Sequence, residues 1–358
     1  MSNSKEQKLT PQQRAMLFGA STRQHIQMLG AQTINGGAQT VSFRVPKSRI
    51  MQGVRLYVDG NINVKHASGS SAPLDKLAIY DVLRRISIDF NNGFNPIVVS
   101  GSEQALVNML YPNPGMIFPT EDGTSLATAP KSLKSSTTGA DNDFSFMLDV
   151  PLTVNYRDPV GLVLAQNAET NIDIILDFNN PAQIINNLSG YTLEFKDVKV
   201  IPSVTSFSIP SDSRCFPDMS VLKVVDSRNE QFTAGNQYIK LPVGMIYRKL
   251  ILKFTDEAGN PMSIDDITSN IELIMNTADT PYSISPKMLR AINKMQAGVD
   301  MPEGVYYWSF DFQGINGYGG SRDYIDTERV TEFAVRFTTG RAGKLHIISE
   351  KLSRLIAG

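Results

Sequence analysis

After residue 37, apolar and polar positions alternate along most of the chain, which is the pattern of strands buried on one face. Turn-forming pairs lie at Asp59-Gly60, Asn92-Gly93, Asp122-Gly123 and Asn316-Gly317. Short helices are expected at Ser102–Leu110, at Pro159–Gln166 and at Ser285–Met295. The pattern favours an all-β sandwich or barrel with a few crossover helices. The predicted strands of the first half are Thr40–Val45, Val54–Val58, Arg85–Phe90, Phe144–Val150, Asn171–Phe178 and Tyr191–Val200.

The first 37 residues follow a different pattern. Thr10 and Pro11 form a helix start, because Thr caps free amides and Pro at the first helical position loses no hydrogen bond. No further proline occurs before Leu29, and scattered apolar residues predict a weakly amphipathic helix over Pro11–Leu29. Asn35-Gly36-Gly37 then predicts a hinge or turn.

An internal repeat is the most informative feature of the β-rich part. Val41–Gly60 is matched 196 residues later by Gln237–Asp256, and Pro46 falls on Pro242. The same order of elements then recurs, with Ser102–Leu110 matched by Ser285–Met295, Phe144–Val154 by Val305–Phe312, Thr170–Phe178 by Val330–Thr338, and Tyr191–Val198 by Gly343–Glu350. Each copy has the size of a jelly roll of about eight strands. The sequence predicts two tandem eight-stranded jelly rolls (a double jelly roll) with short inserted helices and an N-terminal helical arm.

Domain boundaries follow from the repeat. The Ser- and Pro-rich segment Ser203–Ser220 lies between the two copies. The expected units are an arm over residues 1–37, a first roll over 38–205 and a second roll over 206–358. The first copy is longer mainly because of Tyr111–Asp143, which we expect to be an extended exposed loop.

Composition excludes several classes of function. Lys and Arg number 34 and Asp and Glu number 35, so no chain-wide basic surface for coating nucleic acid is expected. With Cys215 as the single cysteine, neither an intrachain disulfide nor a thiolate metal cluster can form. No secretory signal is expected in the first 30 residues, and no apolar run approaches the ~18 residues that span a bilayer.

Charge is concentrated in the arm, where Lys5, Lys8, Arg14 and Arg23 outnumber Glu6. This local net charge of +3 predicts contact with an acidic surface, either lipid headgroups or a neighbouring subunit. Weak attraction of each copy would suffice if many copies were arrayed side by side. The alternative is that the arm packs along its own sandwich.

Residues that could carry catalysis or bind metal are scarce. None of His25, His66 and His346 has the spacing of a metal site or a catalytic triad. The acidic pairs near residues 141–143 and 265–266 lack the rest of a calcium loop, so turn or cap roles are expected. Tyr306 and Trp308 share a strand face, where core packing is expected rather than a sugar-binding platform. We therefore predict no catalytic, cofactor-binding or metal-binding residue.

The basic N-terminal helix followed by two jelly rolls, each with an inserted helix, resembles the double jelly-roll major capsid proteins of tailless icosahedral viruses with an internal membrane. The opening Ser4–Gln32, the paired Pro46 and Pro242, and the chain length are most similar to the tectiviruses that infect Bacillus-type bacteria. The resemblance implies a structural protein without enzymatic activity. It implies homotrimers of pseudo-hexagonal outline that tile an icosahedral shell over a lipid membrane.

The resemblance also implies where the chain acts and with what. Its location would be the virion, and the host cytoplasm during assembly. Its partners would be neighbouring copies, the inner membrane and minor capsid or vertex proteins, without sequence-specific nucleic-acid binding. The arm would face the lipid through Lys5, Lys8, Arg14 and Arg23, and Tyr111–Asp143 would form an outer tower.

Two other functions stay open at this point. Some two-domain jelly-roll proteins hydrolyse glycans or amides, which would need a carboxylate pair ~5–10 Å apart in a cleft. A carbohydrate-binding spike is the other alternative. The few His and Trp residues and the lack of clustered acids argue against both.

Overall fold

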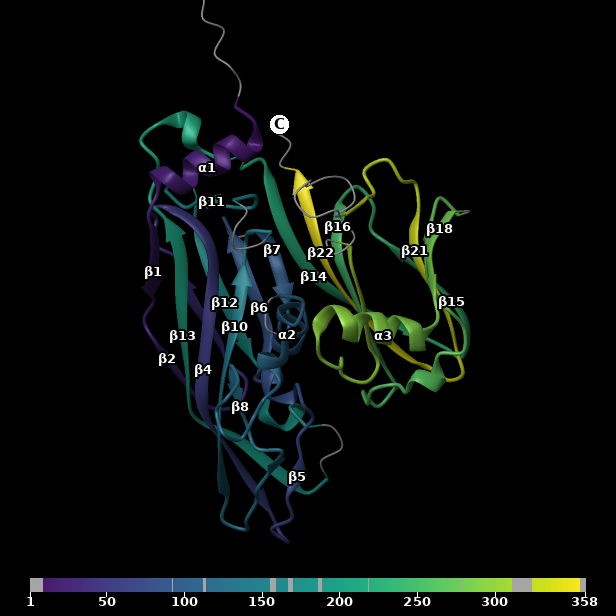
Figure 1. Ribbon diagram of the computed structural model, residues 1–358. Helices are drawn as coiled ribbons and strands as arrows, with labels where there is room; N and C mark the ends of the chain where they lie inside the picture. The colour runs from purple at the N-terminus through teal and green to yellow at the C-terminus, as the bar shows by residue number, and fades with distance from the viewer. Residues whose placement is uncertain are drawn as a thin grey trace, which may run out of the picture.

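The computed structural model describes residues 9–91, 93–111, 114–154, 159–166, 170–185, 189–217, 219–277, 279–310 and 324–354. Figure 1 shows two β-rich bodies side by side, whose strands run roughly along the long axis of the molecule. The helices are α1 (Pro11–Ser21), α2 (Gly101–Asn108) and α3 (Pro286–Ala297), and the short 3-10 helices are η1 (Ala78–Val82), η2 (Pro114–Ile117), η3 (Pro181–Gln183), η4 (Ser213–Cys215) and η5 (Ile264–Asp266).

The first roll consists of two facing sheets. One has the order β1-β13-β4-β10-β8, with β2 beside β13 and β11 beside β4. The other has the order β7-β6-β12-β3, and β5 and β9 form a separate pair. The bounds are β1 (Gln24–Met28), β2 (Gln32–Gly36), β3 (Thr40–Arg44), β4 (Ile50–His66), β5 (Ala72–Pro73), β6 (Leu83–Phe90), β7 (Phe94–Val99), β8 (Ala127–Thr128), β9 (Ser132–Leu133), β10 (Ala140–Pro151), β11 (Val163–Leu164), β12 (Ile172–Phe178) and β13 (Tyr191–Phe207).

The second roll repeats this arrangement. One sheet has the order β14-β22-β16-β19, with β20 beside β16, and the other has the order β15-β21-β17-β18. The bounds are β14 (Val221–Phe232), β15 (Gly235–Leu241), β16 (Ile246–Thr255), β17 (Ile271–Met275), β18 (Asp279–Ile284), β19 (Val305–Ser309), β20 (Ile325–Asp326), β21 (Phe333–Thr339) and β22 (Gly343–Arg354).

The strand pairings confirm the predicted double jelly roll. In the first roll β12 pairs with β3 and β6, and β4 pairs with β13 and β10. In the second roll β21 pairs with β15 and β17, and β16 pairs with β22 and β19. These are the partners that the repeat in the sequence predicts, and α2 and α3 occupy the same place in the two halves.

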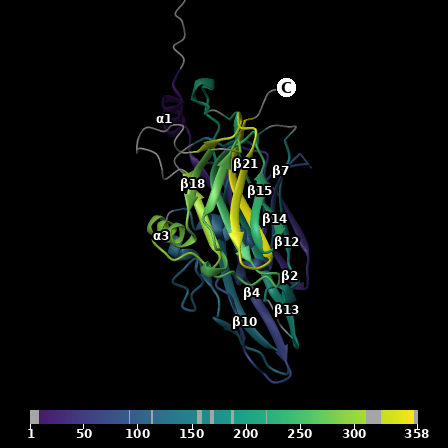
Figure 2. The ribbon, with the colours of Figure 1, turned by 90° about the vertical axis from the view of Figure 1, so that its right-hand side faces the viewer.

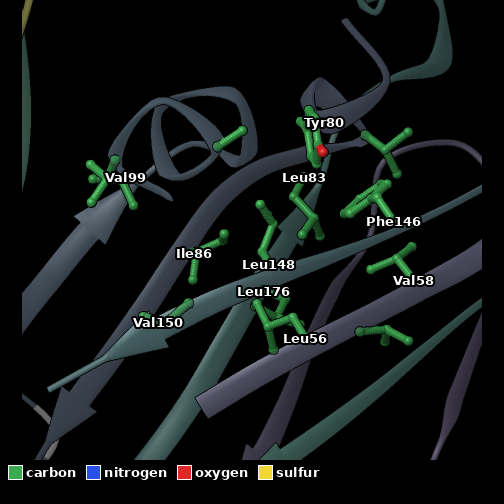
Figure 3. Packing of buried hydrophobic residues seen from close by; sticks show 14 of the residues in the cluster. Leu56, Val58, Tyr80, Leu83, Ile86, Val99, Phe146, Leu148, Val150 and Leu176 are labelled. Atoms are coloured by element: carbon green, nitrogen blue, oxygen red, sulfur yellow. The ribbon is translucent and has the colours of Figure 1, made fainter. Parts of the chain in front are cut away.

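Each roll encloses a core made by the alternating positions of its strands. In the first roll, Leu56 and Val58 of β4 meet Leu148 of β10, Ile86 of β6 and Leu176 of β12, as Figure 3 shows. Leu56, Val58, Leu148 and Leu176 have no exposed surface. The core of the second roll is rich in aromatic rings and is built around Leu250, Leu252, Phe254, Phe333 and Phe337.

The predicted helix Pro11–Leu29 is wrong in its second half. The helix α1 ends at Ser21, where the backbone N–H and the side-chain hydroxyl of Thr22 both donate to the Phe18 carbonyl. Gln24–Met28 and Gln32–Gly36 instead form strands that pair with β13. The edge of β13 offers backbone partners over its whole length, and these outweigh the weak helical pattern of the segment.

Several smaller predictions also need correction. Pro159–Gln166 contains strand β11 and no helix. Asp59-Gly60 is inside β4, where glycine is needed because a Cβ at Gly60 would come within 2.6 Å of the Val198 Cα. The helix α2 is capped by Ser100 and not by Ser102. The predicted turn at Asn316-Gly317 lies outside the described residues.

The long segment of the first roll is folded rather than extended and exposed. Tyr111–Asp143 contains η2, β8, β9 and the start of β10, and it buries Ile117, Ala127 and Leu133. Strand β13 also continues to Phe207, through the predicted boundary at residue 205. The apolar residues of these segments pack against the first core, which the count of prolines and glycines did not reveal.

Candidate functional site

The two rolls are joined by a shared sheet and a shared core. Strand β7 of the first roll pairs in parallel with β14 of the second, Ile97 opposite Val225 and Val98 opposite Asp226. The buried cluster of the first roll extends into the second through Val225, Ile251, Tyr307 and Ile348, among others. The rolls are therefore fixed to each other, as the adjoining positions of β7 and β14 in Figure 1 illustrate.

A buried cluster of charged groups lies at this junction. The Glu350 carboxylate has no exposed surface; its Oε2 lies 3.2 Å from Lys223 Nζ, and its Oε1 lies 3.7 Å from Lys249 Nζ. The hydroxyl of Tyr111, which follows α2, donates to Glu350 Oε2 at 3.0 Å and accepts from Lys223 Nζ at 2.6 Å. The Lys249 ammonium also lies 4.2 Å from the centre of the Tyr111 ring. A side chain of the first roll thus completes a polar network of the second.

The charges around Glu350 determine its protonation. Burial opposes ionisation of this carboxyl, but attraction by Lys223, Lys249 and Arg248 outweighs burial and lowers its pKa to about 2. In Asp149 burial prevails over the attraction of Arg55 and Lys223, and its pKa rises to about 6. The junction therefore holds one carboxylate that stays ionised under all mild conditions.

A matching pair of asparagines holds each inserted helix to its roll. Asn108 of α2 donates to the Asp149 carbonyl at 2.7 Å and accepts from the Asp149 N–H at 3.0 Å. Asn293 of α3 makes the same two bonds to Tyr307, also at 2.7 and 3.0 Å. Neither asparagine was predicted from the sequence, although each follows the cap of its helix, Ser100 or Ser285, by eight positions.

The N-terminal helix is anchored at one end of the first roll. Thr10 caps α1 through the Gln13 N–H, and Phe18 is buried against Ile50 and Leu162, with its ring 5.3 Å from that of Phe207. The hollow between α1 and the roll has a volume of about 300 Å³. Met16 of α1 is 76% exposed, so the helix presents apolar surface outward as well as inward.

The structure describes two of the four basic arm residues. Arg14 is half-buried in α1, and Arg23 is exposed between α1 and β1, where its backbone exchanges hydrogen bonds with Ser208. Lys5 and Lys8 lie outside the described residues.

The aromatic and histidine residues named above as candidates for chemistry are buried or packed against other side chains. Tyr306 and Trp308 are 1% and 4% exposed, so their predicted core role is confirmed. His66 stacks on Tyr191 at 4.1 Å between ring centres, and burial lowers the pKa of His346 to about 4. No group of three or more His, Cys, Asp or Glu residues in the described part of the chain is placed to hold a metal ion. Among the same residues, no helix is long and apolar enough to cross a membrane.

Comparison with solved structures identifies the fold. The crystal structure of the major capsid protein of Sulfolobus Turreted Icosahedral Virus matches with a TM-score of 0.68 and 14% identity over 93% of this chain and 97% of that one. The PBCV-1 virus capsid matches with 0.60 and 11% over 94% and 95%. The major capsid protein P2 from bacteriophage PM2 matches with 0.55 and 11% over 93% and 98%. No family model matches the chain, and no curated protein does.

Proposed function

We propose that this chain is a viral major capsid protein, a structural component of the virion that is located in the host cytoplasm during assembly. The observation that carries the proposal is the rigid side-by-side pairing of two jelly rolls, joined by the β7–β14 pairing and one continuous core. Solved viral capsid proteins share this architecture over nearly the whole chain. A shell needs units that keep their shape while many copies pack together, and near-neutral net charge allows such packing.

The proposed assembly is a homotrimer in which three chains present six rolls of similar outline. Three such chains form a pseudo-hexagonal tile, and tiles cover an icosahedral shell. The partners are neighbouring copies and minor capsid or vertex proteins, and no sequence-specific nucleic acid is bound. Within this proposal the chain is not an enzyme and uses no cofactor.

The finer proposal is a shell of the tectivirus type over an internal membrane. The helix α1 and the segment with β5, β8 and β9 lie at opposite ends of the molecule in Figure 1. If the end with α1 faces the membrane, Lys5, Lys8, Arg14 and Arg23 are near the lipid, and the part of Tyr111–Asp143 around β9, which pairs with β5, is toward the outer surface. The exposed Met16 supports this orientation, since an apolar side chain beside basic residues suits a lipid interface.

Assembly is tested by size-exclusion chromatography with light scattering, followed by electron microscopy of the concentrated protein. We expect a trimer mass and, on concentration, hexagonal tiles or shells. A protein that stays monomeric at all concentrations would contradict the capsid role. Binding of a glycan array or cleavage of a glycan by such a monomer would favour a spike or a hydrolase instead.

The arm is tested by removing residues 1–21, which leaves β1 and β2 in place. We expect this variant to form trimers but to lose sedimentation with vesicles that contain anionic lipid. The charge-reversed variant Arg14→Glu with Arg23→Glu is the matched control for loss of charge without loss of α1. Unchanged vesicle binding by the truncated protein would refute a membrane role of the arm.

A further inference from the structure

Residues of the two rolls can be paired one by one at the junction. The contacts of a residue in one roll therefore indicate which contacts its counterpart in the other roll can make. Ser100 and Ser285, Asn108 and Asn293, and Leu110 and Met295 are all separated by 185 residues. The first two pairs have the same structural role, as caps and as helix-to-strand clamps. Strand β18 with α3 is therefore the counterpart of β7 with α2.

The edge strands on the other side correspond as well. Val225 of β14 lies opposite Glu350 of β22, which lies opposite Lys249 of β16. Ile26 of β1 lies opposite Thr205 of β13, which lies opposite Gly53 of β4. Gly53 and Lys249 are 196 residues apart, as in the sequence repeat, so Ile26 takes the place of Val225.

Corresponding residues differ sharply in exposure. Val225 is 2% exposed because β7 and the first core cover it, whereas Ile26 is 60% exposed. Leu110, after α2, is 7% exposed, whereas Met295 of α3 is 78% exposed. Met288 lies one heptad before Met295 on the same helix face and is also largely exposed. The surfaces around Val225 and Leu110 are buried between the two rolls, whereas the corresponding surfaces around Ile26 and Met295 are not covered by another roll.

Two strand edges are open at the same places. Strand β1 ends its sheet with β13 as its described partner, and β18 ends its sheet with β17 as its described partner. These edges lie on opposite sides of the molecule in Figure 1, and in Figure 2 β18 and α3 lie on the same side of the second roll, at the left of the view. Exposed edges with apolar side chains are ready to pair with another chain.

We infer that β18 and α3 of one copy bind β1 and the adjoining face of β13 and β4 of a second copy, repeating between molecules the β7–β14 contact that joins the rolls within one. Tyr282 would then lie opposite the partner's Ile26, and Ser283 opposite the partner's Gln27, in a parallel pair. Tyr111, which follows Leu110, lies against Lys249, the counterpart of Gly53, so Met295 would cover the partner's sheet near Gly53. The contact is head-to-tail, so it generates a ring when the rotation closes. The inference rests on the proposed self-assembly.

Cysteine pairs test this register in a background with Cys215→Ser. Gln27→Cys and Ser283→Cys are made in separate proteins, mixed and oxidised, and the products are separated on non-reducing gels. We expect a disulfide-linked dimer only in the mixture, because opposed residues in paired strands lie within disulfide reach. Asn236→Cys, on exposed β15 at the other edge of the β18 sheet, is the matched control that should not link to Gln27→Cys.

The outcomes separate the inference from the proposed function. If light scattering shows a trimer but Gln27→Cys does not link to Ser283→Cys, this interface is overturned and the capsid role still stands. A disulfide between Gln27→Cys and Asn236→Cys has the same consequence. If two copies of the Gln27→Cys protein form a disulfide with each other, the contact is two-fold, and this also overturns the inference. A monomer at all concentrations overturns both.

Charge insertion provides a second readout without cysteines. Ile26→Asp and Met295→Asp should each raise the concentration needed for assembly about tenfold or more, since each places a charge in the centre of the contact. Val243→Asp, at a residue that is 42% exposed on the β15–β16 loop, should assemble as the parent does. Circular dichroism confirms that each variant is folded, and unchanged assembly of both folded variants would overturn the inference.

Discussion

The two rolls share their strand pairings, but the same sheet has opposite surroundings in each. In the second roll the outer face of the β14-β22-β16-β19 sheet is enclosed by the first roll and carries Lys223, Lys249 and Glu350 in a buried network. In the first roll the equivalent face carries Ile26 and Tyr57, both exposed. A repeated fold therefore does not repeat its environment, because each copy has a different neighbour.

The difference also shows what the ionic network can contribute. Buried charges cost desolvation energy and are tolerated only when their partners are held in place. Here Tyr111 of the first roll bridges Lys223 and Glu350 of the second. Because Tyr111 comes from the other roll, the charged groups have all their partners only when the two rolls dock correctly.

The largest expected effect comes from removing the centre of this network. Glu350→Ala should lower the free energy of unfolding by about 3–5 kcal/mol, because three cationic side chains lose their buried counter-charge. Thr205→Ala, at the corresponding position of the first roll, should cost about 1 kcal/mol. Urea denaturation of both variants measures the difference. Equal losses would show that the two faces are energetically alike.

The same carboxylate sets an acid dependence. Its folded pKa of about 2 lies below the ordinary 4.5, so its stabilising contribution is complete above pH 4.5 and is lost as the pH falls toward 2. Glu350→Gln should flatten the stability profile in that range.

Asn108 and Asn293 make the same two hydrogen bonds in the two rolls, so substituting them tests whether these bonds contribute equally to the stability of each roll. Asn108→Ala and Asn293→Ala should each cost about 2–3 kcal/mol, since each leaves a strand N–H and C=O without a partner in a buried place. Asn236→Ala, at an exposed strand position, is the control and should change stability little. Urea midpoints of the three variants provide the measurement. A large loss in only one roll would break the equivalence on which the comparison rests.

A smaller effect is expected from His346 in the second roll. Burial and the nearby Lys253 and Lys344 lower its folded pKa to about 4 from the ordinary 6.5. The unfolded chain therefore takes up the proton first, and stability should fall by about 2 kcal/mol between pH 6.5 and pH 4. His346→Gln should remove this part of the profile, whereas His25→Gln should keep it. Thermal unfolding measured across this pH range tests the prediction. If stability depends on pH in the same way in His346→Gln as in the parent protein, the prediction is wrong.

The smallest expected effect separates the two helix caps. Ser100 and Glu103 cap reciprocally, whereas the Ser285 hydroxyl accepts one bond from the Met288 N–H at 3.4 Å. Ser100→Ala should cost about 1 kcal/mol, and Ser285→Ala should cost less. Thermal denaturation of the two variants measures the order, and the reverse order would show that cap geometry does not control it.

Most of the fold was predictable from the sequence. Alternation located the long strands, since half-buried strands must place every second side chain in the core. The repeat located equivalent strands in the two halves, and Pro46 and Pro242 marked the same turn. The pattern failed at Gln24–Met28, because an edge strand with both faces largely exposed has no alternation to detect.

The candidate site was much less predictable. The alternation of apolar and polar positions gave no sign that Lys223, Lys249 and Glu350 are buried, and Tyr111 was only the first residue of the predicted loop Tyr111–Asp143. Nothing in the sequence indicated that one roll would enclose the outer face of the other.

The sequence by itself determined that two similar β-sandwiches would form, because periodicity and turn residues are local properties that each segment carries alone. Only the tertiary structure decided which faces are enclosed, where Glu350 finds its cations, and that Ile26 and Met295 remain open. Those features depend on contacts between segments far apart in the chain, and burial is a property of the neighbour as much as of the residue.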